Sequence, residues 1–111
     1  MEVLIANNNI IIKGKVNENI NELWYAIRQI QSKTINIIFD YHIYDIPVIY
    51  ILLLDKIKTS IDLKFNIYCK KKNVDDGDND DIKVKLSMDS FNSFGFQPKL
   101  IREINQIDKI D

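Results

Sequence analysis

Between residues 10 and 68, segments with a two-residue apolar repeat alternate with helix-length amphipathic segments. A two-residue repeat is typical of a half-buried strand, and a 3.6-residue repeat is typical of a helix packed on one face. The resulting order is strand, helix, strand, helix, strand. We therefore predict an α/β fold, built as a small mixed sheet with about three helices.

The chain length and composition fit a single domain over residues 1–111. Of these residues 46% are hydrophobic and 28% charged, which are ordinary values for a globular protein. The net charge of −1 provides no overall positive field that would attract a polyanion or an acidic membrane surface.

Two features bear on the cellular setting. Cys69 is the single cysteine, so it has no partner for an internal disulfide. The first residues have neither the basic nor the apolar part of a signal peptide, and the longest apolar run, residues 46–54, is too short to cross a bilayer. We expect a cytoplasmic protein without a membrane span.

The positions of asparagine residues indicate where the first two strands and the first helix lie. Two apolar runs, residues 3–5 and 10–12, flank three asparagines, a residue type that tolerates the left-handed backbone of tight turns. This pattern predicts an N-terminal hairpin. Asn19 and Glu22 then form a variant capping box, which predicts that a helix begins there and continues to Ile30.

The middle of the chain predicts a central strand, a turn and a second helix. Residues 34–39 are rich in β-branched side chains, and Asp45 and Pro47 are typical of a helix start. Residues 48–57 are apolar almost all round. Such a helix is buried on more than one side, either inside the domain or in an interface.

A third strand and a C-terminal hairpin complete the prediction. Residues 63–69 alternate, with Cys69 on the apolar face in a packing role. Residues 82–86 also alternate, so we expect them to return antiparallel, with charged residues 70–82 at the hairpin tip. Pro98 is expected to open a last helix over about residues 98–109.

Candidate catalytic and metal sites are weak. Asp76, Asp78 and Asp80 match the first calcium ligands of an EF-hand, but the glycine is misplaced and Ser87 stands at position twelve. His42, the single histidine, has no nucleophile and base around it in the sequence. We predict no enzyme activity, no catalytic residue, no metal site, no cofactor and no small-molecule substrate.

Residues 10–30 (IIIKGKVNENINELWYAIRQI), 35–40 (INIIFD), 45–58 (DIPVIYILLLDKIK) and 63–69 (LKFNIYC) resemble the STAS domain. This is the fold of bacterial anti-sigma-factor antagonists and of the cytoplasmic tails of sulfate transporters. The resemblance covers about residues 10–70. It rests on the element order, on Gly14 ahead of the first helix, and on Asp40 at the end of a strand that leads to an apolar helix.

The chain departs from the family at the second helix. Antagonists of this family carry an Asp-Ser pair there, and phosphorylation of the serine switches partners, whereas this chain has Asp45-Ile46. The segment from Asp40 to Asp45 is also about three residues shorter, and the sequence after Cys69 differs further. The resemblance therefore implies a non-phosphorylated scaffold or adaptor.

We accordingly expect a non-enzymatic, regulatory protein-interaction module. The expected contact surface is the turn after the central strand together with the exposed side of the second helix. Its candidate partner-binding residues are Tyr41, His42, Tyr44, Asp45, Pro47 and Tyr50. The expected partner is another protein, and a homodimer with a second copy of the chain is one candidate.

The alternative is a DNA-binding accessory protein that uses a lysine-rich hairpin. Either lysines 70–72 together with Tyr68, or Lys83 and Lys85, would contact phosphates. The aspartates between residues 75 and 81 would repel the same nucleic-acid backbone, so the protein-binding hypothesis is favoured.

Overall fold

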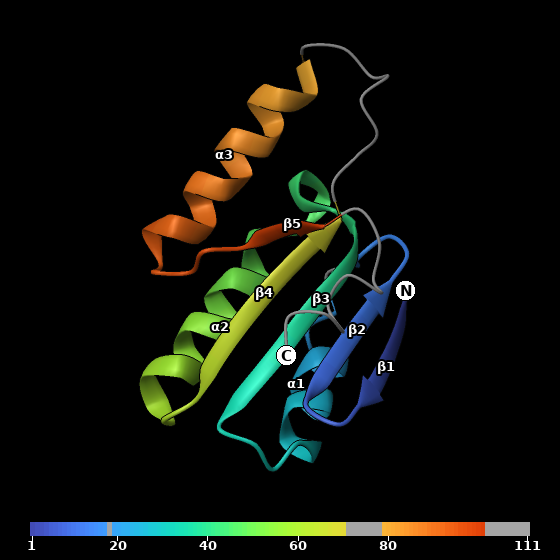
Figure 1. Ribbon diagram of the computed structural model, residues 1–111, viewed down its shortest axis with the longest axis vertical. Coiled ribbons are helices and arrows are strands. Elements are labelled where there is room, and N and C mark those ends of the chain that lie inside the picture. Colours follow the sequence, from blue (N-terminus) through green and yellow to red (C-terminus); the bar gives the residue numbers. More distant parts are fainter. Residues whose placement is uncertain (18, 71–78, 102–111) are drawn as a thin grey trace.

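Five strands form one sheet whose spatial order follows the chain, β1-β2-β3-β4-β5 (Figure 1). The computed structural model describes residues 1–17, 19–70 and 79–101. β1 and β2 are antiparallel, and the pairs from β2 to β5 are parallel. The strands are β1 (Glu2–Ala6), β2 (Asn9–Lys13), β3 (Thr34–His42), β4 (Lys64–Lys70) and β5 (Lys99–Ile101). The predicted α/β fold with a mixed sheet is confirmed.

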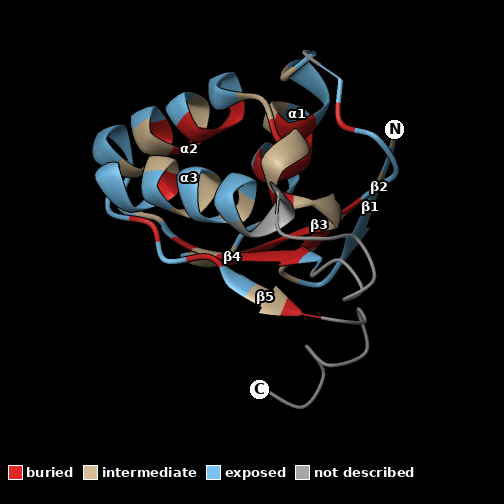
Figure 2. Ribbon diagram, turned by 90° about the horizontal axis from the view of Figure 1, so that it is seen from above, coloured by how far each residue is buried: buried red, intermediate tan, exposed pale blue. Residues whose placement is uncertain are grey.

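Three helices connect the parallel strands: α1 (Asn21–Gln29), α2 (Val48–Ser60) and α3 (Asn79–Ser93). Parallel neighbours require a crossover connection, and crossovers of one hand between sequential strands lie on the same side of the sheet. Figure 2 shows all three helices on one face of the sheet. The main core therefore lies between this helix layer and the sheet.

The N-terminal hairpin is confirmed. β1 and β2 are joined by Asn7 and Asn8, and Asn7 has a φ of 56°, in the left-handed region that asparagine tolerates. The register pairs Ala6 with Asn9 and Leu4 with Ile11. β2 can therefore serve as an inner strand while β1 forms the edge of the sheet.

Both helix starts differ from the prediction. The Asn19 side chain accepts a hydrogen bond from the Asn21 N–H at 3.1 Å, but α1 begins at Asn21 and its N-cap position is Ile20. Asp45 belongs to a short 3-10 turn, η1 (Ile43–Asp45), and Pro47 occupies the N-cap position of α2. The asparagine and the aspartate shape the turns that lead into the helices.

The core between the helices and the sheet is built from alternate strand residues. Cys69 is among them and is fully buried, which confirms its predicted packing role. Burial raises the pKa of its thiol, so the reactive thiolate is disfavoured. Ile38 is also buried almost completely, but it lies on the other face of the sheet. The large side chains of the main core that are buried almost completely are Ile10, Ile12, Leu23, Ile35, Ile37, Phe39, Ile43, Tyr50, Ile51, Leu54 and Phe91.

An asparagine ladder crosses the other face of the sheet. The register places Asn9, Asn36 and Asn66 side by side on three parallel strands. The Asn36 amide donates to the Asn9 side-chain oxygen at 2.8 Å, and the Asn66 amide donates to the Asn36 oxygen at 3.0 Å. Asn36 is buried, so these two bonds satisfy a polar group that would otherwise be costly to bury.

The predicted C-terminal hairpin is wrong. Residues 82–86 belong to α3, and the strand that follows β4 in the sheet is β5, which is parallel to it. Val84, Met88 and Phe91 are spaced as one helical stripe, and all three pack on the main core. This longer repeat outweighs an alternation of only five residues. Residues 71–78, most of the expected hairpin tip, lie outside the described residues.

The predicted C-terminal helix is also wrong where it can be compared. Pro98 precedes a strand, because Lys99–Ile101 pairs with residues 68–70 of β4. Residues 102–111, the remainder of that predicted helix, lie outside the described residues.

We predict that Asn36→Ala lowers the free energy of unfolding by about 1–3 kcal/mol, because it leaves the Asn9 oxygen and the Asn66 amide without their partner. Urea unfolding measures this change. Asn66→Ala is the matched control, since Asn66 ends the ladder and is only partly buried, and we expect it to cost less. Equal losses in the two variants would contradict a stabilising ladder.

Candidate protein-binding surface

The turn between β3 and α2 is anchored at both ends by buried side chains. The register between β3 and β4 shifts between Phe39 and His42, so the chain bulges before it enters η1. Ile43 and Ile46 are buried in the core, and the Ile46 N–H donates to the Ile43 carbonyl at 3.3 Å. Anchoring of this kind holds the side chains between them in a defined position.

Three rings pack together along this turn. The His42 ring stacks on Tyr44, with centroids 5.2 Å apart and planes at 5°, and it also contacts Tyr41 at 5.0 Å. The Lys83 ammonium of α3 lies 5.7 Å from the centre of the Tyr44 ring. The structure thus brings together Tyr41, His42 and Tyr44, which the sequence predicted as partner-binding residues. All three are half-buried.

The polar groups at the turn do not assemble a reactive set. His42 Nδ1 is buried and has no hydrogen-bond partner within the described residues. Asp40 contacts Lys70 at 3.9 Å, and both side chains are partly exposed. Among the side chains that the structure describes, in residues 1–17, 19–70 and 82–101, no three His, Cys, Asp or Glu are grouped so that they could hold a metal ion.

Tyr50 lies inside the molecule, and its predicted contact with a partner does not fit this position. It is 0% exposed, and its ring meets Phe39 edge to face. Its hydroxyl donates to the Asn17 carbonyl at 2.6 Å and lies 3.3 Å from the Asn19 carbonyl. Tyr50 therefore fastens α2 to the connection between β2 and α1. Asp45 and Pro47 remain half-buried at the turn.

The outer side of α2 is apolar and exposed. Val48, Ile49 and Leu52 are 54%, 41% and 46% exposed, whereas Ile51 and Leu54 on the inner side are buried. Of the two predicted alternatives, burial of this helix on more than one side inside the domain is therefore wrong, and burial in an interface stays a prediction. An apolar helix face that is left open is typical of a contact surface.

A cleft of about 180 Å³ lies between α2 and α3, next to the exposed side of α2. Leu86 of α3, which is 61% exposed, stands on the opposite wall. The residues that line the cleft are Ile46, Val48, Ile51, Leu86, Ser87, Ser90 and Phe91. We call Val48, Ile49, Leu52 and Leu86 the α2/α3 patch. Leu86 is not among the predicted contact residues, because the alternation over residues 82–86 predicts a strand there.

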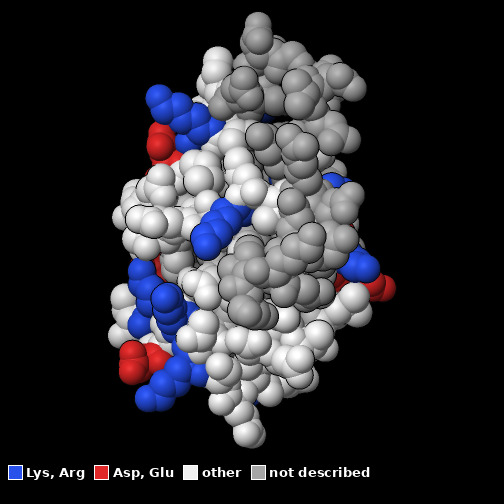
Figure 3. Space-filling view, in the orientation of Figure 1, with Lys and Arg blue, Asp and Glu red and all other residues white. Residues whose placement is uncertain are grey.

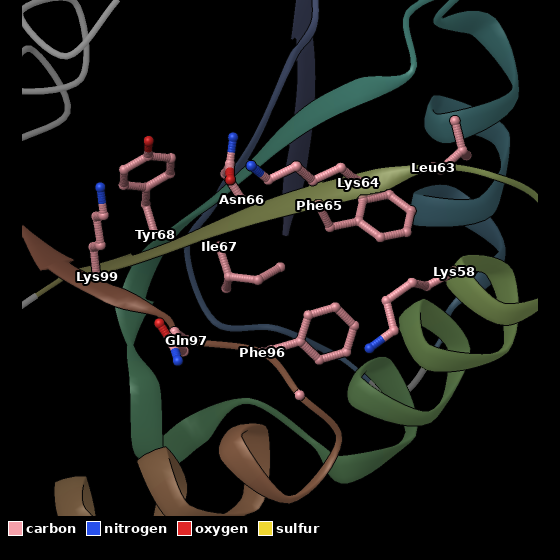
Figure 4. Close-up of a pocket in the computed structure, with 11 residues that line it drawn as sticks. Lys58, Leu63, Lys64, Phe65, Asn66, Ile67, Tyr68, Phe96, Gln97 and Lys99 are labelled. Atoms are coloured by element: carbon pink, nitrogen blue, oxygen red, sulfur yellow. The ribbon is translucent and has the colours of Figure 1, made fainter.

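A second, larger cleft of about 390 Å³ lies beside β4 (Figure 4). Figure 4 shows Asn66, Tyr68 and Lys99 on one side of the sheet, with Ile67 and Phe96 on the other. The Lys58 ammonium donates to the Phe94 carbonyl at 2.7 Å and lies 4.4 Å from the centre of the Phe96 ring. Lys58 therefore links α2 to the segment that follows α3.

The chain matches no family model, no curated protein and no solved structure. In the described parts of the chain, none of the helices has both the length and the apolar character needed to cross a membrane.

We predict that Tyr50→Phe lowers the free energy of unfolding at pH 7 by about 1 kcal/mol, because the Asn17 carbonyl loses a partly buried hydrogen bond. Tyr25→Phe is the matched control. Tyr25 is 61% exposed, and we expect a change of less than about 0.5 kcal/mol. Urea unfolding of both variants measures the difference, and equal effects would contradict the assignment.

Alkaline pH adds a second prediction for Tyr50. Burial, followed by the nearby Glu22 carboxylate, raises the pKa of the phenol above its ordinary value of 10.0. Above that pH the unfolded chain binds fewer protons than the folded chain, so stability falls as the pH rises. We expect Tyr50→Phe to lose less stability than the wild type between pH 9 and about pH 11. A parallel loss in both proteins would assign the effect to other groups.

Proposed function

We propose that this chain is a STAS-like, non-enzymatic adaptor that binds another protein through the α2/α3 patch and the turn before α2. The observation that carries the proposal is the exposure of Val48, Ile49 and Leu52 on a helix whose opposite side is core. Such side chains lose contact with water when a partner covers them, and burial of apolar area drives association.

The shape of the patch supports a helical partner. Two helices form the walls of the cleft beside Val48, and apolar side chains line most of it. An amphipathic helix laid into a groove between helices is a recurrent mode of protein recognition. The Tyr41, His42 and Tyr44 rings lie on the turn that leads into α2, where aromatic side chains add contact area at low entropic cost.

The proposed adaptor has no phosphoswitch at the start of α2. Ile46 stands where the family's antagonists carry the phosphorylated serine, and it is buried in the core. A buried isoleucine offers neither a hydroxyl nor access to a kinase. Binding through this surface therefore depends on the availability of the partner and on its affinity.

The residues that the structure describes do not favour the DNA-binding alternative. Lys83 and Lys85 lie on α3, where two positions correspond to about 200° around the helix, so they point to different sides. Lysines 71 and 72 lie outside the described residues. On the face seen in Figure 3, the described basic side chains stand in small groups, several of them beside acidic ones.

A pair of matched substitutions tests the proposed surface. We predict that Leu52→Glu reduces recovery of a cross-linked partner from the native host at least tenfold, which corresponds to about 1.4 kcal/mol of binding free energy. Ile61→Glu is the control. Ile61 is apolar and 50% exposed, but it lies just past the other end of α2. Both changes are at the surface and should alter stability little.

Recovery is measured by quantitative mass spectrometry after cross-linking with the wild type and with each variant. Equal recovery by Leu52→Glu and the wild type would contradict the surface assignment. Loss of recovery with both variants would also contradict it, because the effect would then not depend on the α2/α3 patch.

A further inference from the structure

The two edges of the sheet are protected to very different degrees. Proteins usually guard a sheet edge with a short strand, with proline or with charged side chains, because unpaired backbone groups can pair with another chain. The described part of β5 is three residues long, begins with Lys99 and follows Pro98. β1 has five residues, with sequence EVLIA, and contains no lysine or proline. Figure 1 shows β1 at the outer edge, beyond β2.

Hydrogen bonding within the sheet determines which backbone groups of β1 point outward. The Asn36 N–H of β3 donates to the Asn8 carbonyl, so residues 8, 10 and 12 direct their backbone groups to β3. Alternate residues point the opposite way, so residues 9, 11 and 13 bond to β1. Their register partners are Ala6, Leu4 and Glu2. The backbone groups of Val3 and Ile5 therefore point away from the sheet.

We propose that a second copy of this chain pairs with this edge, β1 antiparallel to β1, with Leu4 at the twofold axis. In this register Val3 faces Ile5 of the second copy, and the two pairs exchange four backbone hydrogen bonds. Leu4 faces Leu4 of the second copy in a non-hydrogen-bonded pair, where side chains approach most closely. The result is one continuous ten-stranded sheet, because each copy supplies five strands.

The side chains favour a second copy as the occupant. Leu4 and Ile5 are 40% and 41% exposed, and pairing would cover both. The single charge on the strand, Glu2, would face Ala6 of the second copy, so no like charges oppose each other. A twofold contact requires a surface that is complementary to itself, and this register meets the requirement. The edge lies apart from the α2/α3 patch, so this inference is independent of the proposed function.

Disulfide trapping tests the register directly. Leu4→Cys would place two cysteines opposite each other at about 4.5–5.5 Å between Cα atoms, within the range of a disulfide. Ala6→Cys is the matched control on the same face of the strand. Its two copies would be about 14 Å apart, because four residues of strand separate them. Cys69 is fully buried and leaves the readout clean.

In a glutathione redox buffer, we expect Leu4→Cys to form at least ten times more covalent dimer than Ala6→Cys on a non-reducing gel. Equal dimer in the two variants, or none in either, would overturn the proposal.

Sedimentation of charged variants provides a second, independent readout. The wild-type mass should rise from that of one chain to that of two chains as concentration increases. Leu4→Lys should hold the protein monomeric, because two like charges would meet at the twofold axis. Ala6→Lys should dimerise at least as well as the wild type, because the new charge would face Glu2 of the second copy.

Circular dichroism of each variant confirms that the monomer remains folded, and both positions are exposed at the surface. A wild type that stays monomeric at every concentration would overturn the proposal. A dimer that persists in the Leu4→Lys variant would also overturn the proposal, because that dimer would use another surface.

Discussion

The parallel pairing of β3 with both β2 and β4 is the constraint on which the rest of the structure depends. A parallel neighbour can be reached only by a crossover, and crossovers of one hand between sequential strands lie on the same side. The helices are therefore confined to one face, and Ile35, Ile37 and Phe39 of β3 lie at the centre of the core beneath them. The opposite face is stabilised differently, by the ladder of asparagine amides and by Ile38 and Tyr68.

This arrangement explains why α2 has two unlike apolar sides. It is the middle crossover, and its inner side supplies Ile51, Leu54 and Ile57 to the core. The Tyr50 hydroxyl fixes its rotation by its hydrogen bond to the Asn17 carbonyl. With this rotation fixed, Val48 and Leu52 must point outward. The exposed patch is therefore a consequence of how α2 is held, and its apolar composition is what a binding surface requires.

Much of the fold is predictable from local patterns. Of the two wrong elements, one has two competing local repeats, and the other depends on strand pairing that no local pattern holds. Turn residues, β-branched runs and long periodic segments predict the N-terminal hairpin, β3, α2 and β4. The alternation over residues 82–86 predicts a strand, although Ile82 and Leu86 fit a helical i, i+4 spacing equally well. β5 has three residues and no period of its own. It forms because β4 offers an open edge.

The candidate site was predictable in part. The aromatic turn follows from its place after a central strand, and its rings do come together. The inward position of Tyr50 was not predictable, because a helix that is apolar all round has no pattern that distinguishes its inner side. The Asn36 ladder joins residues 27 and 30 positions apart, and only the sheet register brings them together. Contacts between segments far apart in the sequence decide both the inward position of Tyr50 and the asparagine ladder.

The central claim is that α2 presents an open apolar side, and methyl NMR with a soluble paramagnetic agent tests it most directly. In the protein alone, the methyl signals of Val48, Ile49, Leu52 and Leu86 should broaden strongly, because these side chains are exposed. The signals of Ile51, Leu54 and Ile57 should be spared, because these side chains are buried. The account would be contradicted if the methyl signals of Val48 and Leu52 were broadened as little as those of Ile51 and Leu54.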